Sequence, residues 1–399
     1  MKAVLAQAQD GDTIQINAGT YYENLDITQR SLTILGAGAS VTTLYGEDGV
    51  KTLPGAVIRN ADMTARDLVV EGLTFAEGTA WRGLIEGEAV GGNVCWSNEE
   101  CSGSFAIRNC VLESGTASYG GGLYVHGLRN VVVESCEFRN NHASRAGGNG
   151  FLAGCLTRRG EIVFAGNTIE IGGRSGRDAG GFFAMDADRI EFSGNRVSST
   201  PNREPCRGII ILNIAEIRLD GNIVEDDGGD CASYITAENF THGAVKVEFT
   251  NNTVRRSGAG VPREPVLMGS SHDLIVTGNT VWGTKLVCST GFGTGMVTHN
   301  VVSGGLLHAD FTGTGEVACN VTWPDPIVVT GQRPVMADNV VADPLFCDPA
   351  GGDLRVAATS PCVTNPACAR IGAYTVGCGD TPVLKQSWGA IKARWGVAR

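Results

Sequence analysis

The chain has 399 residues, a formal net charge of −11 and charged residues at only 18% of its positions. This negative charge disfavours nucleic acid as a partner, because nucleic acids bind basic surfaces. No run of about 18 apolar residues occurs, so we expect no membrane span. The 56 glycines are typical of a chain with many tight corners.

Residues 1–60 are predicted to form the first coils of the fold and an N-terminal cap. The stretch MKAVLAQAQDGD lacks an apolar core long enough for a signal peptide, and its AVLAQAQ part is typical of the last turns of a helix. We therefore expect that a leader has been removed upstream. The strands TIQI, SLTILG and GAVIRN follow, separated by glycine and asparagine.

Residues 61–345 are predicted to form the body of the fold, because one short pattern recurs in them. From Ile162 to Val341 a few alternating apolar residues, a turn, an asparagine and another β-prone residue are repeated, as in IEFSGNRV and IRLDGNIV. The asparagines are 19 to 30 residues apart: Asn167, Asn195, Asn222, Asn252, Asn279, Asn300, Asn320 and Asn339. A strand-forming repeat of this length indicates a solenoid.

The repeat length fits one coil of a tube. A strand rises about 3.3 Å per residue, so about 20 residues hold two or three short strands and their turns. Coils stacked about 4.8 Å apart would pair each strand in parallel with its equivalents above and below. We expect the asparagines to stack at one corner as an amide ladder, where asparagine tolerates the left-handed conformation.

A loop near residues 79–104 is predicted to project from the wall, because the spacing between Leu73 and Cys110 swells to 37 residues. It carries Trp81 and Trp96, which would stack on sugar rings if they are exposed. The alternative is that both tryptophans pack within the loop.

The repeat resembles the right-handed parallel β-helix of the pectin-lyase-like superfamily. The likeness extends upstream to FAIRNCVLE, with Cys110 in the asparagine position, and to the opening AQDGDTIQINAGTYYENLDITQRSLTILGAG, which is similar to the first coil of secreted members. It implies an all-β fold, a right-handed single-stranded parallel β-helix of roughly eleven to thirteen coils. Lyases, hydrolases, epimerases, adhesins and structural tubes share this fold, so the fold alone does not define an activity.

The C-terminal part divides into two segments. Residues 346–380 are rich in cysteine and resemble the closing segment of the superfamily. In residues 381–399 the apolar Trp388, Ile391 and Trp395 recur at helical spacing. Basic residues accompany them: Lys385, Lys392, Arg394 and Arg399. This pattern predicts a basic amphipathic helix that docks on the tube or serves as a sorting tail.

The 13 cysteines indicate an oxidising compartment and hence a secreted or cell-surface protein. We expect bridges between Cys95 and Cys101 and between Cys206 and Cys231. Two more bridges are expected among Cys347, Cys362, Cys368 and Cys378. Five cysteines within strand patterns are expected to be buried free thiols: Cys110, Cys136, Cys155, Cys288 and Cys319. No cysteine or histidine spacing indicates a structural metal site.

Coils between Cys136 and Asn252 are 27 to 31 residues long, against 19 to 21 after Asn279. If the extra residues all leave the tube at one corner, they raise a wall beside a groove. Their polar residues would then share a face: His142, Arg174, Arg177, Arg203, Arg207, Asp226, Asp227 and Asp230. Such a mixture suits an acidic polysaccharide, because arginine binds carboxylates bidentately and aspartates hold calcium.

The resemblance to pectate-lyase-like members implies a mechanism. In those enzymes calcium acidifies the proton beside the uronate carboxylate, and an arginine is the base of a β-elimination. Here the calcium ligands would be Asp226, Asp227 and Asp230, and the base would be Arg203 or Arg207. The substrate would be bound by Arg174, Arg177, His142, Trp81 and Trp96.

Two other interpretations stay open. In the first, arginines and aspartates of neighbouring coils pair with one another on a solvated surface, and the protein is a non-catalytic adhesin or structural tube. In the second, Asp230 with Cys231 and His242 with Gly243 resemble the Asp-Asp-Cys and Gly-His-Gly elements of polygalacturonase-like hydrolases, in which two carboxylates cleave a glycosidic bond. The Asn-Thr-Asp and Arg-Ile-Lys elements of that family do not occur in this sequence.

Overall fold

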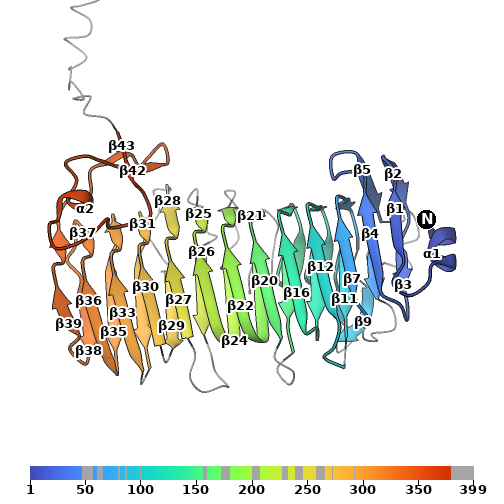
Figure 1. Cartoon of the computed structure of the whole chain (residues 1–399), viewed down its shortest axis with the longest axis horizontal. Helices are drawn as coiled ribbons and strands as arrows, with labels where there is room; N and C mark the ends of the chain where they lie inside the picture. The colour runs from blue at the N-terminus through green and yellow to red at the C-terminus, as the bar shows by residue number, and fades with distance from the viewer. Residues whose placement is uncertain are drawn as a thin grey trace, which may run out of the picture.

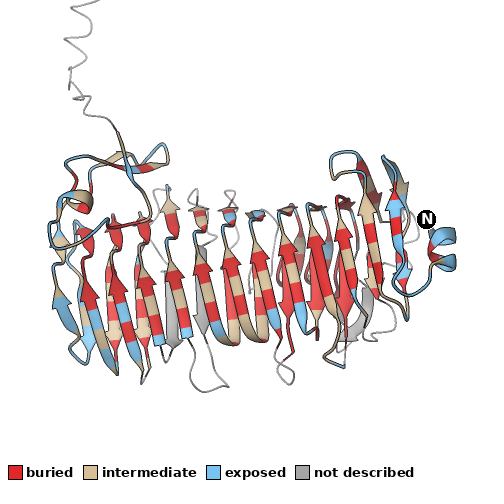
Figure 2. Ribbon diagram, viewed as in Figure 1, coloured by how far each residue is buried: buried red, intermediate tan, exposed pale blue. Residues whose placement is uncertain are grey.

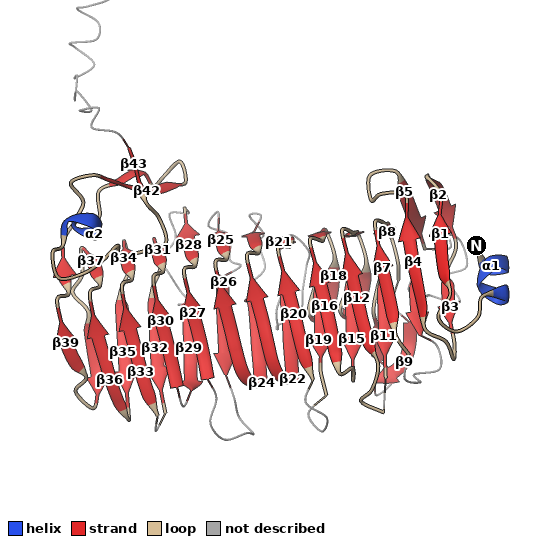
Figure 3. Ribbon diagram, viewed as in Figure 1, coloured by secondary structure: helices blue, strands red, loops and turns tan. Residues whose placement is uncertain are grey.

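The computed structural model of the chain is a long tube of short strands (Figure 1). It describes residues 1–46, 57–60, 66–79, 81–85, 88–98, 100–155, 160–171, 180–199, 207–226, 232–238, 246–257, 266–271, 273–291 and 293–378. Within these residues the helices are α1 (Lys2–Gln7) at the start of the tube and α2 (Pro361–Thr364) near its other end, and the rest is strand or turn (Figure 3). The chain thus has the all-β fold that the repeat predicts.

Three faces, which we call face 1, face 2 and face 3, form the wall of the tube, and each is a stack of parallel strands. Face 1 contains β1 (Thr13–Ile16), β4 (Leu32–Gly36), β7 (Leu68–Glu71), β12 (Ser104–Arg108), β16 (Asn130–Glu134), β20 (Glu161–Ala165), β22 (Phe182–Ser193), β24 (Arg207–Asp220), β27 (Lys246–Thr250), β30 (Asp273–Thr277), β33 (Thr294–Thr298), β36 (Thr314–Ala318) and β39 (Val335–Ala337).

Face 2 is joined to face 1 through the long strands β22 and β24, whose first halves lie in it. Its other strands are β3 (Leu25–Ile27), β6 (Ile58–Asn60), β11 (Val94–Ser97), β15 (Leu123–His126), β19 (Gly150–Ala153), β26 (Ala232–Glu238), β29 (Val266–Ser271), β32 (Leu286–Thr290), β35 (Leu307–Phe311) and β38 (Val328–Gly331).

Face 3 is a separate parallel sheet. Its strands are β2 (Gly19–Tyr22), β5 (Thr42–Tyr45), β8 (Thr74–Ala76), β13 (Val111–Glu113), β17 (Glu137–Arg139), β21 (Thr168–Ile171), β23 (Arg196–Ser199), β25 (Ile223–Asp226), β28 (Thr253–Arg256), β31 (Thr280–Trp282), β34 (Val301–Ser303), β37 (Val321–Trp323) and β40 (Val340–Val341). Two small sheets lie beside the tube: β9 (Trp81–Ile85), β10 (Glu88–Val90), β14 (Thr116–Tyr119) and β18 (His142–Ala146), and β41 (Phe346–Asp348), β42 (Asp353–Ala357) and β43 (Val376–Cys378).

Alternate residues of each strand point into the tube and form its core. In β20, for example, Ile162 and Phe164 are fully buried, and they are in register with Ile190 and Phe192 of the next coil. Stacked side chains of one kind therefore run along the axis, as with the rings of Phe164 and Phe192, whose centroids are 5.0 Å apart. Each such side chain contributes about 1.5–3 kcal/mol on burial, so the core stabilises every coil through its neighbours (Figure 2).

The predicted asparagine ladder is confirmed at the corner between faces 1 and 3. The amide oxygen of Asn222 accepts bonds from the backbone N and the Nδ2 of Asn195, at 2.9 and 3.0 Å. Its Nδ2 donates to the oxygens of Phe192 and Asn252, at 2.8 and 2.9 Å. The same pattern is repeated to Asn339, so these buried amides are satisfied inside the protein.

We expected the asparagine itself to be the left-handed residue of this corner. The structure shows instead that the residue before it is left-handed. Gly166, Gly194 and Gly221 have φ between 61° and 65°, and each precedes a ladder asparagine. Asn251 and His299 occupy the same position with φ of 54° and 58°. The left-handed residue bends the chain from face 1 into face 3, and the asparagine that follows it is buried.

A second buried asparagine network lies near the N-terminal half and was not predicted. Asn93 Nδ2 donates to Asn141 Oδ1 at 3.2 Å, and Asn141 Nδ2 donates to Asn149 Oδ1 at 3.0 Å. Glycine is required beside it, because a Cβ on Gly121 would lie 2.3 Å from the carbonyl oxygen of His142. This corner therefore depends on backbone packing as close as glycine allows.

The described residues contain three disulfides, two of which differ from the predicted pairs. Cys101 bonds Cys155 and Cys319 bonds Cys368, so the expected Cys95–Cys101 bridge and the expected free thiols of Cys155 and Cys319 are wrong. Cys347 bonds Cys378 within the predicted group, but Cys362 is free. The free thiols of Cys110, Cys136 and Cys288 are confirmed. Cys206 and Cys231 lie outside the described residues.

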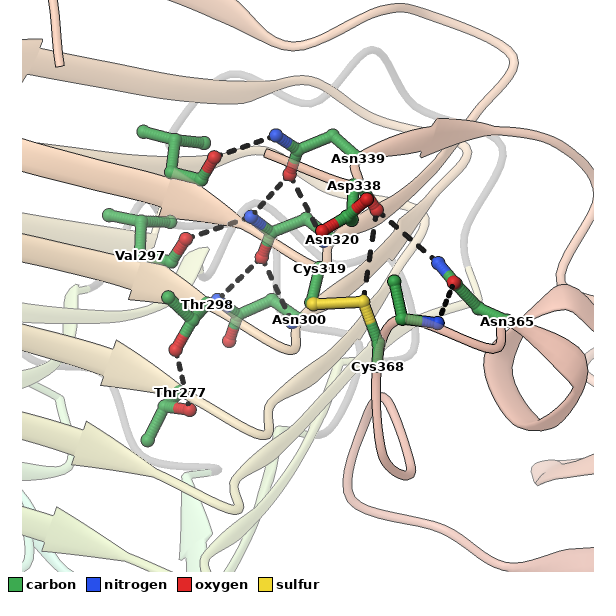
Figure 4. Close-up of a disulfide and its surroundings, with 12 residues drawn as sticks. Thr277, Val297, Thr298, Asn300, Cys319, Asn320, Asp338, Asn339, Asn365 and Cys368 are labelled. Carbon is green, nitrogen blue, oxygen red and sulfur yellow. Dashed lines mark hydrogen bonds between the residues drawn. A yellow bond between two sulfur atoms is a disulfide. The ribbon is translucent and has the colours of Figure 1, made fainter. Parts of the chain in front are cut away.

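Residues 343–378 pack on the outside of face 3. Val301 and Val321 form an apolar cluster there with Val356, Cys362 and Ile371. The backbone N of Gly372 donates to the oxygen of His299 at 2.7 Å, and the Cys319–Cys368 disulfide lies beside the end of the asparagine ladder (Figure 4). This segment therefore covers the side of the tube.

We predict that Asn222→Ala lowers the free energy of unfolding by about 3 kcal/mol, because it leaves buried partners in two coils unsatisfied. The shift of the denaturant midpoint measures the effect. Asn130→Ala is the control, since Asn130 is an exposed asparagine at the start of β16 and its loss is expected to change stability by less than about 0.5 kcal/mol. Equal shifts in both variants would contradict a structural role of the ladder.

The buried free thiols are predicted to resist alkylation in the native protein. Burial raises the pKa of Cys95 and of Cys288 to about 12, so both remain protonated in the fold at pH 9 while they ionise in the unfolded chain. Stability should therefore fall as the pH rises from about 8.5 toward 12. Mass spectrometry after iodoacetamide treatment should detect both labels only in denaturant, and rapid native labelling would refute this burial.

Candidate functional site

Four strands that precede extra residues of the long coils end at one corner of the tube, where their ends are stacked. Ile171, Ser199, Asp226 and Arg256 end β21, β23, β25 and β28, and each is in register with the next. The segments that follow these ends carry most of the predicted site. We call this place the insertion corner.

Apart from Trp96, the predicted site residues divide into three groups. Arg174, Arg177, Arg203, Asp227, Asp230 and His242 lie outside the described residues. Arg207 begins β24, Asp226 ends β25 and Trp81 begins β9. His142 is half-buried in β18, in register with Thr116 of β14.

Trp96 is the one predicted binding residue that the structure contradicts. It lies in β11 with no exposed surface, in the core of the tube, so it cannot stack on a sugar. The reason is that β11 belongs to face 2 and pairs with β6 and β15. The extra residues before Cys110 thus form part of the wall, with the antiparallel pair β9 and β10 beside it, rather than one projecting loop.

On the outside of face 1, described arginines and lysines pair with carboxylates of the same or the next coil. Arg189 lies 3.5 Å from Glu161, Arg218 lies 3.0 Å from Asp220, and Lys246 lies 2.5 Å from Glu248. Burial alone would raise the pKa of Asp220, but hydrogen bonds from Thr250, Asn251 and Arg218 hold it below its usual range. Of these three pairs, Arg189 with Glu161 joins neighbouring coils, and the other two lie within one strand.

The ion pairs give way to a groove toward the C-terminal end of face 1. It runs along the tube axis between two rows of outward side chains, which we call the axial groove. One row is Lys246, Asp273, Thr294 and Thr314, and the other is Ile275, Met296, Glu316 and Val335. The groove has a volume of about 650 Å³.

Glycine forms part of the floor of the axial groove. Gly295 and Gly315 lie in register between the two rows, and the ring of Phe311 fills the space behind them, since a Cβ on Gly295 would lie 2.0 Å from that ring. Met296 and Val335 are 42% and 68% exposed, which is unusual for such side chains. The Thr294 hydroxyl donates to Asp273 Oδ1 at 2.7 Å, so these two residues of the first row are joined to each other.

Neither a metal site nor a membrane helix is found in the described part of the chain. No three His, Cys, Asp or Glu side chains among the described residues are grouped so that they could hold a metal ion. No helix in these residues is long and apolar enough to cross a membrane. The predicted calcium ligands Asp227 and Asp230 lie outside the described ranges, so the calcium site stays a prediction.

Comparison with known proteins supports the fold. Residues 95–281 match the family model described as right handed beta helix region. Together with the stacked parallel strands, this match shows that the chain has a right-handed parallel β-helix fold.

Among solved structures, a catalytic domain of a GH87 α-1,3-glucanase in complex with tetrasaccharides is similar at 12% sequence identity and a TM-score of 0.30. The match covers 84% of this chain, which spans about half (55%) of that one. No curated protein matches the sequence.

Proposed function

We propose that this β-helix binds a polysaccharide in the axial groove. The observation that carries the proposal is that two rows of side chains of different chemistry line the groove side by side along the tube axis. One row offers hydroxyl, carboxylate and ammonium groups, and the other offers the half-buried Ile275 and the exposed Met296 and Val335 beside the carboxylate of Glu316. Sugar rings present hydroxyl groups at their edges and CH groups on their faces, so a sugar chain can contact both rows at once.

The length of the groove favours a polymer over a single sugar. From Lys246 in β27 to Val335 in β39 the groove crosses four coil steps, which is about 19 Å at 4.8 Å per step. A chain lying along the axis would meet similar groups at each step. Low affinity at each step then adds up over the length of the polymer.

The charge of the groove favours a neutral polysaccharide. Asp273 and Glu316 supply two carboxylates, whereas Lys246 supplies one ammonium group that already pairs with Glu248. A polyanion would be repelled by these carboxylates. A uronate polymer would instead need the arginines that the sequence concentrates at the insertion corner. The two surfaces therefore suit different ligands.

We predict that Met296→Asp weakens binding of a neutral polysaccharide at least tenfold, because it removes apolar surface and places a third carboxylate in the groove, beside Asp273 and Glu316. Isothermal titration against a panel of soluble neutral and acidic polysaccharides measures the affinity. Val41→Asp is the matched control, since Val41 is a 49% exposed apolar residue of a turn far from the groove. Unchanged affinity in Met296→Asp, or no binding to any neutral member, would reject the groove as the site.

A second candidate is calcium-dependent elimination of a uronate polymer at the insertion corner. It is favoured by the stacking of Ser199, Asp226 and Arg256, which brings the starts of three long insertions within two coil steps. Asp226, Asp227 and Asp230 would supply the hard oxygen ligands that calcium prefers, and Arg203 or Arg207 would remove the proton beside the uronate carboxylate. The elimination would leave a double bond conjugated to that carboxylate.

This candidate predicts growth of ultraviolet absorbance on incubation with pectate or alginate, with loss of the signal after chelation of calcium. Arg203→Ala with Arg207→Ala should reduce the rate at least a hundredfold, since general bases contribute about 10²–10⁴ in rate. Arg189→Ala is the control, because Arg189 pairs with Glu161 on the outside of face 1. If no uronate polymer yields absorbance and no polysaccharide binds, a structural or adhesive tube is the remaining function.

A further inference from the structure

The C-terminal end of the tube exposes its core. Met336 and Val341 of the last described coil are 50% and 52% exposed. Their partners one coil earlier, Val317 and Thr322, are in register with them and have no exposed surface. Because residues in register point the same way, Met336 and Val341 occupy core positions that no described residue covers from the other side. Figure 2 shows exposed residues in the last strands at this end of the tube.

The backbone is open at the same end. In the described residues β38, β39 and β40 each pair with the preceding coil alone, through β35, β36 and β37. Their outer edges present peptide groups that a further strand or a cover could satisfy. An uncovered stack of edges beside apolar side chains is a surface on which other chains would aggregate.

The N-terminal end shows how this protein covers such a surface. Helix α1 lies across it, with Leu5 8% exposed and Met1 packed against the core. Arg30 Nη1 donates to the oxygens of Leu5 and Ala8, both at 2.7 Å, and the Met1 ammonium lies 2.8 Å from Glu23. At the other end residues 343–378 do not do this, because they pack on the outside of face 3.

We propose that residues 381–399 cover the open end as an amphipathic helix. Trp388, Ile391 and Trp395 recur at helical spacing and would form one apolar stripe against Met336 and Val341. A helix over residues 385–398 would be about 20 Å long, longer than the four-residue strand β38. One such helix crosses the end of the tube.

Charge favours this occupant. Residues 381–399 contain four basic residues and no acidic residue. The last coil and the turn after it, residues 324–348, carry four exposed aspartates and the single base Arg333: Asp325, Asp338, Asp343 and Asp348. A second copy docked end to end would bring two such acidic rims together, which disfavours a dimer through this end.

The segment begins within reach of the end. Cys378, the last described residue, has its Cα 5.4 Å from that of Cys347, and Cys347 follows the last strand of the tube by six residues. Residues 379–384 then span at most about 20 Å when extended. The disulfide thus holds the start of the segment close to the coil that it would cover.

Hydrogen–deuterium exchange tests the proposal. In the full chain the amides of β38, β39 and β40 should exchange at least tenfold more slowly than in a chain that ends at Asp380, while β15 to β20 exchange equally in both. Trp388→Asp with Trp395→Asp in the full chain should reproduce the loss of protection, and it decides the matter if the shorter chain does not fold. Gln386→Asp, predicted to lie on the opposite side of the helix, should leave the protection intact.

Two results would overturn the proposal. Equal exchange at β38 to β40 with and without residues 381–399 would mean that this segment does not lie on the end. Protection that disappears on dilution, together with a dimer in light scattering, would mean that a second copy covers it. Neither result depends on whether the axial groove binds a polysaccharide.

Discussion

The pairing of each coil with the next is the constraint on which the whole structure depends. A short strand with two open edges is stable only if both edges are paired, so each coil needs a neighbour on either side. The ladder amides obey the same rule inside the tube, since Asn195 and Asn222 each bond the coil before and the coil after. An asparagine in this position is a side-chain copy of the backbone: it donates and accepts along the axis. Removing one of them leaves unsatisfied groups in both neighbours.

A fixed perimeter also determines where function can arise. Since every coil must return to the same register, residues beyond those needed for three strands have to leave the wall. The strands that end at Ile171, Ser199 and Asp226 precede such residues, and these strand ends are stacked at one corner. Another variable part is the outward half of each strand, where any residue is tolerated that does not disturb the core. The insertion corner and the axial groove are the two candidate regions, and the axial groove is formed by the wall itself.

The sequence was sufficient for what depends on the coil repeat. Asn167 and its successors marked the corner correctly, because a buried amide ladder leaves a regular spacing. The sequence was insufficient for predicting contacts between residues that are far apart along the chain but close in space. Cys101 and Cys155 are 54 residues apart but lie in contact across stacked coils, whereas Cys95, six residues from Cys101, points elsewhere. The prediction for Trp96 was wrong for a related reason. The spacing of 37 residues does not reveal which of those residues return to the wall of the tube as β11. Most of the predicted site, including Arg203 and Asp230, stays untested.

The axial groove could not have been predicted from the repeat, because its residues are distinguished by the absence of the ion pairs found on the preceding coils of face 1. On face 1 the register that stacks the core side chains also stacks the outward-facing side chains. Through β20, β22, β24 and β27 outward-facing side chains form ion pairs, such as Arg189 with Glu161. At β30 the same outward row changes to Ile275 and then to Met296. Exposed apolar side chains cost solubility and add nothing to a core that lies on the other side of the sheet. Over several coils, apolar side chains replace the ion pairs at the same register positions, beside threonine hydroxyls. This change is therefore better explained by binding of a ligand than by a gain in stability.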